Sequence, residues 1–309
     1  MSQEEFVAGA ASHQIVVIGA GVAGLAAAAE AARLGLTTAL FDDGLLGGLV
    51  TNVGALQGAP KINEQAGADV VTAMLGDALE AGVDYQMGEI AELAGAEGGW
   101  SLPGHEVTAG QVILATGAAL RRLNVPGEEA LMGRGVSQCA FCDGGLYRGK
   151  NAVVVGGGDS AFQEALHLAE ICANVTMVLR GLQPRARQDF VTQVTGHDNL
   201  CLRLGVEVRE IIGDDGVAAV RLYDQGAGTE ETLPIDAVFP FVGLAPQTAL
   251  APMDAKRDET GALIVDANMR TGQAGFYAIG ATRSGYGGQV AHALEDARAA
   301  AQAALRDAY

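Results

Sequence analysis

The chain has 309 residues, which is enough for two domains of ordinary size. Hydrophobic residues make up 49% of it and charged residues 18%, so a sizeable core can be buried. The formal net charge is −18 at pH 7, whereas nucleic acids and anionic membranes attract proteins with clustered lysines and arginines. We therefore expect no nucleic-acid partner and no membrane partner.

The N-terminal and cysteine patterns indicate a cytoplasmic protein without a metal. The first residues, MSQEEFVAGAASHQ, contain two acids and lack the basic segment of a secretory signal. The longest apolar run, Ile15–Ala29, contains three glycines and is too short to span a membrane. Only Cys139 and Cys142 form a CxxC pair, which argues against a four-cysteine zinc site. We expect Cys172 to pack in the core and Cys201 to have no redox role.

A first nucleotide-binding unit is predicted near the N-terminus. Gln14–Ile18 is predicted to be a buried strand, GAGVAG follows at 19–24, and an alanine-rich helix extends to about Leu34. A second strand, Thr37–Phe41, ends at Asp42 and Asp43, about 20 residues after the turn. This order of strand, glycine-rich turn, helix and acid is typical of dinucleotide binding and is more specific than the glycines alone.

Each residue of this motif has a physical task. Gly19 allows the tight turn, Gly21 lets the backbone approach a pyrophosphate, and Gly24 lets helix and strand pack closely. The N-terminus of the helix offers N–H groups and a partial positive charge to the phosphates. Asp42 or Asp43 can accept hydrogen bonds from a ribose.

A second unit of the same kind is predicted further along the chain. The strand Asn151–Val155 leads into GGGDSA at 156–161, the helix Phe162–Ile171 and the strand Val175–Leu179. Arg180 then replaces the acid, which suits a ribose 2′-phosphate. Two such turns imply a flavin at the first and a nicotinamide at the second, unless the second has become a scaffold. The candidate nicotinamide-nucleotide contacts are Gly156, Gly158, Asp159, Ser160, Arg180 and Arg185.

The flanking elements predict how the two units are joined. Gln111–Gly117 and Gly275–Gly280 are predicted strands that end in small-residue turns, and a final helix begins at about Gln289. The second unit therefore lies inside the first domain. We predict an α/β fold of two Rossmann-like nucleotide-binding domains, the second inserted in the first. The FAD-binding domain would comprise residues 1–119 and 246–309, and the NAD(P)H-binding domain with the CxxC pair residues 120–245.

The cysteine pair itself, in CAFCDGG at 139–145, is a redox pair, a metal clip or packed core. Cys139 and Cys142 have the spacing that closes a small ring, and a position at a helix N-terminus favours the thiolate. Asp143 follows directly and can shuttle a proton. These features favour a catalytic role for Cys139, Cys142 and Asp143.

Several longer stretches together carry a family resemblance. They are GAGVAG, the GG of GLLGGLVTN, ATGA, VPGEEALMGRGVSQCAFCDGGLYRGK, GGGDSAFQEAL and FVGLAPQT. With them, the chain resembles low-molecular-weight, bacterial-type thioredoxin reductase over nearly its whole length. The stretch 125–150 is the most specific, because it places CxxCD between the two nucleotide units.

The resemblance implies a homodimeric flavoprotein that passes electrons from NADPH through FAD to the CxxC disulfide and on to a thioredoxin-like protein. It implies that Cys142 is the flavin-proximal cysteine and Cys139 the exchanging one. It also implies that the small domain rotates, and we expect hinges near 118–124 and 243–248. The implied FAD contacts are Gly19, Gly21, Gly24, Asp42, Asp43, Gly47, Gly48, Asn52, Thr116, Gly117, Gly280, Thr282, Gln289 and Val290.

The nicotinamide motif departs from the family pattern. The family has HRR with a further arginine four residues on, whereas this chain has Leu179, Arg180 and Gly181, followed by Arg185. Loss of one of the adjacent arginines weakens the preference for a 2′-phosphate. The donor is therefore left open between NADPH, NADH and another reductant.

The C-terminal flavin motif departs as well. The family's Gly-Asp is replaced by Gly280 and Ala281, and its Arg-Gln by glycine and Gln289. We still expect FAD to bind, through altered contacts. Two family glycines further on are replaced by Glu295 and an alanine. We interpret Glu295 and the neighbouring Asp296 as solvated or as compensating a helix dipole, and the alternative is that they tune the flavin or the dimer interface. His292 is interpreted as having no part in proton transfer.

The sequence thus predicts an FAD-dependent thiol–disulfide oxidoreductase fed by NAD(P)H, with a thioredoxin-like protein or a small disulfide as substrate. Two alternative enzyme functions would use the same two cysteines. One is an FAD dithiol oxidase that forms a disulfide in a small molecule with O₂ as acceptor, and the other is a reductase with a non-nicotinamide donor. A flavin-binding redox sensor is a third, non-enzymatic alternative.

Overall fold

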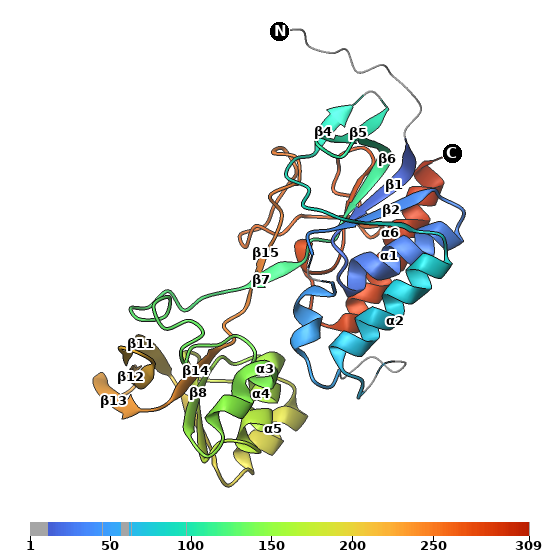
Figure 1. Cartoon of the computed structure of the whole chain (residues 1–309). Coiled ribbons are helices and arrows are strands. Elements are labelled where there is room, and N and C mark those ends of the chain that lie inside the picture. Colours follow the sequence, from blue (N-terminus) through green and yellow to red (C-terminus); the bar gives the residue numbers. More distant parts are fainter. Residues whose placement is uncertain (1–11, 45, 57–61, 63, 97, 309) are drawn as a thin grey trace. The chain divides into compact units, whose positions relative to one another are not determined.

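The chain divides into two compact units, drawn in Figure 1. The computed structural model describes all residues except 1–11, 45, 57–61, 63, 97 and 309. One unit comprises Met1–Ala119 and Ala245–Tyr309, and the other Leu120–Leu244. The crossings between them are the short strands β7 (Ala118–Leu120) and β15 (Leu244–Pro246), which pair with each other.

The discontinuous unit is built on a seven-stranded sheet in the order β3-β2-β1-β6-β5-β4, with β16 also pairing β6. Strands β3, β2, β1, β6 and β16 are parallel, and β5 and β4 are an antiparallel extension. The strands are β1 (His13–Ile18), β2 (Thr38–Asp42), β3 (Asp84–Met87), β4 (Ala94–Ala96), β5 (Gly99–Leu102), β6 (Val107–Leu114) and β16 (Phe276–Ala278).

Three helices, α1 (Val22–Arg33), α2 (Gly67–Glu80) and α6 (Val290–Asp307), lie together on one face of this sheet (Figure 1). Helices α1 and α6 meet through alanines, which share one buried cluster with strand residues such as Ile15 and Val17. Small side chains allow helix axes to approach closely, so the alanine-rich composition of both helices is explained by their packing. Apolar residues of 250–265 cover the opposite face of the sheet.

The continuous unit has a parallel sheet in the order β10-β9-β8-β14 and a separate antiparallel sheet in the order β11-β12-β13. The parallel strands are β8 (Asn151–Val155), β9 (Asn174–Leu179), β10 (Leu200–Leu204) and β14 (Ala237–Pro240). The antiparallel strands are β11 (Val206–Gly213), β12 (Val217–Asp224) and β13 (Thr229–Pro234). The helices are α3 (Ala140–Asp143), α4 (Asp159–Ala169) and α5 (Gln188–Thr195).

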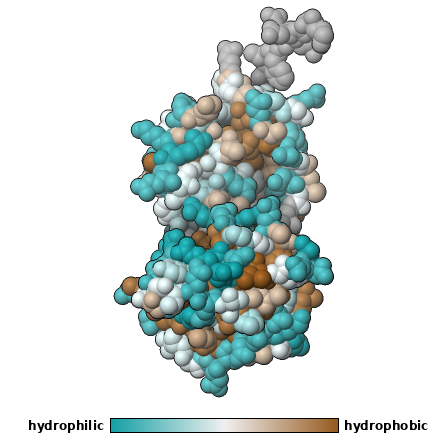
Figure 2. Space-filling view, turned by 90° about the vertical axis from the view of Figure 1, so that its left-hand side faces the viewer, coloured by the Kyte–Doolittle hydropathy of each residue, from teal (hydrophilic) through white to brown (hydrophobic). Residues whose placement is uncertain are grey.

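Helix α4 begins three residues before the predicted Phe162, because Gly158 is its N-cap and the GGGDSA turn enters the helix directly. The described residues also form three short 3₁₀ helices, η1 (Gly48–Asn52), η2 (Gly144–Tyr147) and η3 (Gly280–Thr282). Cys172 is buried in the core of the continuous unit, as predicted, whereas Cys201 is exposed. On the face drawn in Figure 2, hydrophilic residues are interspersed with apolar ones.

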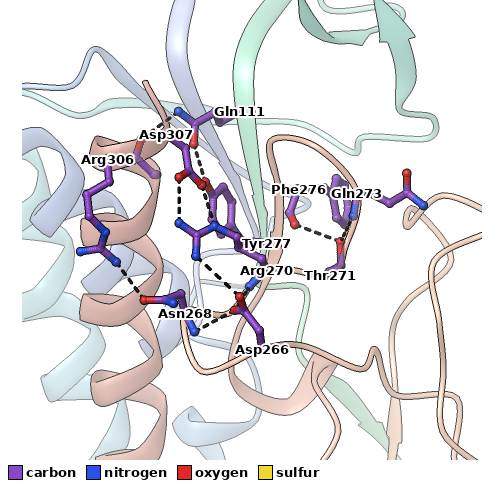
Figure 3. A network of polar contacts seen from close by, with 11 residues as sticks. Gln111, Asp266, Asn268, Arg270, Thr271, Gln273, Phe276, Tyr277, Arg306 and Asp307 are labelled. Carbon is purple, nitrogen blue, oxygen red and sulfur yellow. Dashed lines mark hydrogen bonds and ion pairs between the residues drawn. The ribbon is translucent and has the colours of Figure 1, made fainter. Parts of the chain in front are cut away.

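A polar network fastens the end of α6 to the sheet (Figure 3). The Tyr277 hydroxyl on β16 lies 2.6 Å from Asp307 Oδ2 and 2.8 Å from Gln111 Oε1 on β6. Arg270 donates two hydrogen bonds of 2.7 Å to the Asp307 carboxylate. Its guanidinium holds the pKa of Asp307 down at about 2, below the ordinary value of 3.8.

We expect Asp307→Asn to lower the free energy of unfolding at pH 7 by about 1 kcal/mol, because a charge-assisted pair is lost and its partial exposure weakens it. The folded-state pKa is depressed, so this stabilisation is present above the unfolded-state pKa and is lost as pH falls through about 2. Urea denaturation of the wild type and of Asp307→Asn at pH 7, 4 and 3 measures the difference in their free energies of unfolding. This difference should become smaller as the pH falls. Glu295→Gln, an exposed acid on the same helix, is the control, and equal stability of wild type and Asp307→Asn at pH 7 would contradict the prediction.

Candidate active site

The first glycine-rich turn has the geometry that its residue types predict. Gly19 has a φ of +102°, and a Cβ there would lie 2.5 Å from the Ala115 carbonyl oxygen. A Cβ at Gly24 would lie 1.8 Å from the Gly19 carbonyl oxygen, so neither position accepts a side chain. Gly21 is the N-cap of α1 and forms an isolated β-bridge with Gly47. The turn and the GG segment are therefore adjacent, although 26 residues separate Gly21 from Gly47 in the sequence.

The acid at the end of β2 that points into this turn is Asp42. Its Oδ1 accepts a hydrogen bond of 3.0 Å from the Ala20 N–H, and its Oδ2 is buried without a hydrogen-bond partner among the residues that the structure describes. Burial raises the pKa of Asp42, against the opposing effect of the Ala20 N–H. Asp43 is exposed to solvent. Of the two predicted acids, Asp42 therefore offers the buried unfilled acceptor that a ribose hydroxyl would satisfy.

The remaining predicted flavin contacts are held by backbone hydrogen bonds of the same unit. Thr116 donates to the Gln247 carbonyl at 2.5 Å, and Gln247 donates back to the Gly117 carbonyl at 2.9 Å. The Thr282 hydroxyl is fully buried, 2.8 Å from the Ile279 carbonyl oxygen, so it supports the turn. Gly48 and Asn52 begin and end η1, and Gln289 is the N-cap of α6, whose first residue is Val290.

The interpretation of Asp296 as solvated or dipole-compensating was wrong. Asp296 is 3% exposed, accepts a hydrogen bond of 3.0 Å from the Gly280 N–H and forms a two-point ion pair with Arg283 at 2.7 and 2.8 Å. Neighbours in the sequence do not reveal this pairing, because Arg283 lies on the segment after η3 and reaches α6 only in the folded chain. Glu295 is exposed, as its interpretation as solvated requires, and the role of His292, which is also exposed, stays a prediction. The Gly280 turn, where the family's aspartate is replaced by Ala281, is thus held by a carboxylate of α6.

These features fit an FAD site in this unit. The glycine turns bring backbone N–H groups to one place, and Asp42 retains an unfilled acceptor beside them. The residues that would hold the cofactor are those that the resemblance implies, with Asp42 rather than Asp43 at the ribose and with the Thr282 hydroxyl supporting the turn.

The second glycine-rich turn, like the first, begins at a glycine that leaves no space for a side chain. A Cβ at Gly156 would lie 2.3 Å from the Phe241 carbonyl oxygen, whereas Gly158, the N-cap of α4, has open space around it. Asp159 accepts a hydrogen bond of 2.7 Å from the Arg187 N–H, and the Arg185 N–H donates to the Gly157 carbonyl at 2.7 Å. The loop after β9 is therefore fastened to the turn.

The arginines of this loop differ in whether they form ion pairs. Arg180 and Arg185 are exposed and form no ion pair with a residue that the structure describes. Arg187 pairs with Asp189, and its guanidinium lies 4.6 Å from the centroid of the Phe190 ring. Ser160, the last predicted contact here, is also exposed on the first turn of α4. Arg180 and Arg185 are thus the free cations beside this turn.

Cys139 and Cys142 form a disulfide at the start of α3, with their Cα atoms 5.3 Å apart. Cys139 is the N-cap of the helix, and its Sγ accepts a hydrogen bond of 3.1 Å from the Cys142 N–H. Cys139 is 9% exposed, whereas Cys142 is exposed to solvent. The assignment of substrate exchange to Cys139 therefore does not follow from exposure in the oxidised chain and stays a prediction.

The carboxylate of Asp143 is held beside the disulfide by a residue that the sequence reasoning missed. The Ser137 hydroxyl donates to Asp143 Oδ2 at 2.6 Å and accepts a hydrogen bond of 3.1 Å from the Cys139 N–H. Ser137 is buried, so this geometry is shielded from competing water. The only sequence signal for this role is that Ser137 stands two residues before the first cysteine.

Two features are absent from the described residues. They contain no group of three or more histidine, cysteine or acidic side chains placed to hold a metal ion. They also contain no helix with the length and apolar character that a membrane span requires.

Known proteins resemble the chain over almost its full length. Residues 13–304 match the family described as pyridine nucleotide-disulphide oxidoreductase. The thioredoxin reductase of Listeria innocua is 35% identical over 305 residues, covering 95% of this chain and 93% of its own length. That of Treponema pallidum is 34% identical over 295 residues, covering 94% of this chain and 96% of its own.

Solved structures agree with this relationship. The thioredoxin reductase of Lactococcus lactis has a TM-score of 0.92 at 30% identity and covers 96% of this chain and 99% of its own. That of T. acidophilum has a TM-score of 0.90 at 32% identity, with coverages of 96% and 98%. The chain belongs to the pyridine nucleotide-disulphide oxidoreductase family and is an FAD-dependent thiol–disulfide oxidoreductase of the thioredoxin reductase type. The predicted fold class and enzyme class are confirmed, and the dithiol oxidase alternative is not favoured.

The geometry of the second turn generates a prediction about nucleotide choice. Gly181 has an unstrained backbone and room for a side chain, since the nearest atom to a Cβ there is the Gln183 carbonyl oxygen at 3.6 Å. We expect Gly181→Arg to lower KM for NADPH about tenfold, because a second arginine beside Arg180 adds a charge-assisted pair with the 2′-phosphate worth about 1.4 kcal/mol.

Steady-state kinetics with NADPH and NADH measure this effect. Gly181→Gln is the control of similar length without the charge and should leave both KM values nearly unchanged. A KM for NADPH that Gly181→Arg does not lower would mean that the phosphate is held away from this loop.

Proposed function

We propose that the chain reduces the disulfide of a thioredoxin-like protein with electrons from NAD(P)H. The observation that carries this proposal is the closed Cys139–Cys142 disulfide at the N-terminus of α3, with the Asp143 carboxylate held beside it by Ser137. A structural disulfide needs no such acid, whereas reduction of a disulfide requires a proton for each sulfur.

The two units divide the binding of cofactors between them in this proposal. The unit of Met1–Ala119 and Ala245–Tyr309 holds FAD, and Leu120–Leu244 holds the nicotinamide nucleotide and the disulfide. When bound, FAD accepts electrons from a nicotinamide and passes them to a disulfide. Arg180 and Arg185 favour NADPH over NADH only modestly, because Gly181 stands where the family has another arginine.

The residues around the disulfide have distinct tasks. The Cys142 N–H stabilises negative charge on Cys139 Sγ after the S–S bond breaks, since it already donates to that atom in the oxidised chain. Asp143, oriented by Ser137, carries a proton to and from the cysteines. As the family resemblance implies, Cys142 would be the cysteine that faces the flavin, and Cys139 would attack the substrate disulfide.

An apolar surface beside the disulfide supports a protein substrate. Phe141 is 51% exposed and Leu146 71% exposed, and they lie one and four residues from Cys142 in the sequence. Exposed large apolar side chains next to a reactive site are typical of protein-binding surfaces. We also propose that the protein is a cytoplasmic homodimer, as the family resemblance implies, and a monomeric sedimentation coefficient for the holoprotein would contradict that.

The roles of the cysteines can be separated by mutation. We expect Cys142→Ser to abolish NADPH-dependent reduction of thioredoxin while the bound flavin is still reduced by NADPH, because that half-reaction does not use the thiol. We expect Cys139→Ser to leave the Cys142 thiolate beside the flavin, giving a long-wavelength absorption band. Stopped-flow absorbance under anaerobic conditions and insulin-coupled turnover provide the two readouts.

Cys201→Ser is the matched control, since Cys201 is an exposed thiol of the same unit outside the disulfide. It should retain full turnover. Full disulfide reductase activity in both Cys139→Ser and Cys142→Ser would refute the proposed function.

The proposal also includes a rotation of one unit relative to the other, because nicotinamide and disulfide must each reach the flavin. The crossings β7 and β15 are short and begin directly after Gly117 and Gly243, so few residues need change their backbone angles. Dyes on Cys201 and on Met253→Cys, one exposed position in each unit, would report the distance between units by single-molecule energy transfer.

We expect two energy-transfer populations that exchange in microseconds to milliseconds or more slowly, with NADPH shifting their ratio. Cys172 is buried and Cys139 and Cys142 are bonded to each other, so the dyes are directed to the intended positions in the oxidised protein. A pair of dyes within one unit is the control. One unchanging population, in a protein that turns over normally, would exclude the rotation.

A further inference from the structure

A half-buried acid on α4, Glu164, lies beside the redox helix and has no part in the mechanism derived above. Glu164 lies one turn before His167 and Leu168, which contact the Phe141 ring and Gly144, and the backbone N–H groups of Ala140 and Phe141 at the start of α3 lower its pKa against the larger effect of burial. Its Oε2 is buried and has no hydrogen-bond partner among the residues that the structure describes. A buried carboxylate oxygen left unsatisfied is costly, so its retention beside a reactive site needs a physical account.

The N–H groups at the start of α3 are divided between two acceptors. Those of Ala140 and Phe141 point to Glu164, whereas that of Cys142 points to Cys139 Sγ at 3.1 Å. Unpaired N–H groups at the start of a helix stabilise a thiolate in the N-cap position. The Glu164 carboxylate, on the side of α3 that faces α4, therefore competes with Cys139 for two of the three donors.

Packing keeps Glu164 in this place. Ala140 is fully buried against α4, and a Cβ at Gly144, just after α3, would lie 3.0 Å from Leu168 Cδ2. The Phe141 and His167 rings are 5.4 Å apart, which fixes the next turn of α4 to the same short helix. The distance from carboxylate to disulfide is thus set by the core of one unit.

We propose that Glu164 is a positioning residue that makes the Cys139–Cys142 disulfide harder to reduce, by opposing negative charge on the sulfurs. Reduction adds two electrons to the disulfide, breaks the Sγ–Sγ bond and requires two protons for the two thiols. Whenever one sulfur remains a thiolate, the Glu164 carboxylate raises its energy. The reduced pair is then a stronger donor to a substrate disulfide, which deepens the function proposed above and rests on it.

The test is the reduction potential of the disulfide in the FAD-loaded protein. The protein is equilibrated anaerobically at pH 8 with mixtures of reduced and oxidised dithiothreitol, and Cys139 and Cys142 are trapped by alkylation and quantified by mass spectrometry. Burial raises the pKa of the Glu164 carboxyl group to about 7, so the group is still largely ionised at pH 8. This readout requires neither thioredoxin nor NADPH.

We expect Glu164→Gln, which keeps an acceptor for the two N–H groups but loses the charge, to favour the dithiol about tenfold. That corresponds to a potential about 30 mV less negative. Alkylation of the reduced pair at pH 7 should also become several-fold faster, because more thiolate is present. Glu170→Gln removes an exposed acid at the C-terminal end of the same helix and should change neither quantity.

A dithiothreitol equilibrium constant for Glu164→Gln within twofold of the wild-type value would overturn the proposal and leave Glu164 as a structural cap. If Glu164→Gln fails to fold, Glu164→Asp is the second variant. It retains the charge, so the reduction potential of its disulfide should stay close to the wild-type value. A disulfide that no dithiothreitol mixture reduces would instead contradict the proposed function, so the two failures are distinguishable.

Discussion

Both nucleotide units depend on one steric constraint, the absence of space for a Cβ where a strand turns into a helix. At Gly24 such an atom would lie 1.8 Å from a carbonyl oxygen, and at Gly156 it would lie 2.3 Å from one. Because no side chain intervenes, α1 follows β1 and α4 follows β8 directly, and each helix begins with its N–H groups beside the sheet edge. The sheet orders, the positions of the acids and arginines, and the approach of α4 to α3 all depend on this geometry.

The redox centre is assembled within one unit from three separate parts of the chain. Ser137 orients Asp143 from the segment before α3, the cysteines lie on α3 itself, and Glu164 contacts α3 from the helix of the second nucleotide turn. The glycine turn that presents a nucleotide therefore also sets the position of the acid behind the disulfide. A change in the GGGDSA turn would be expected to alter both nucleotide binding and the environment of the cysteines.

The sequence was most informative where structure is local. The glycine turns, the disulfide at a helix start and the nested order of the two units are each encoded in a short stretch or in the order of stretches, and a family resemblance reinforces them. The roles of Ser137, Glu164 and Asp296 were missed or misjudged because each depends on contacts outside its own stretch. Asp296 meets Arg283 and Gly280 only when α6 packs on the sheet, and Glu164 meets Ala140 only when α4 packs on α3.

The buried acids differ in how far their oxygens are satisfied, and this difference separates structural from functional roles. Asp296 has the Gly280 N–H and both arms of Arg283 as partners, so its charge is fully compensated and it serves the fold. Asp42 accepts a hydrogen bond from the Ala20 N–H, Glu164 lies beside the N–H groups at the start of α3, and each retains one buried oxygen that has no partner among the described residues. Folding alone would select against such an oxygen. In the functions proposed above, a ribose hydroxyl would satisfy the free oxygen of Asp42, and the charge of Glu164 would act on the neighbouring disulfide.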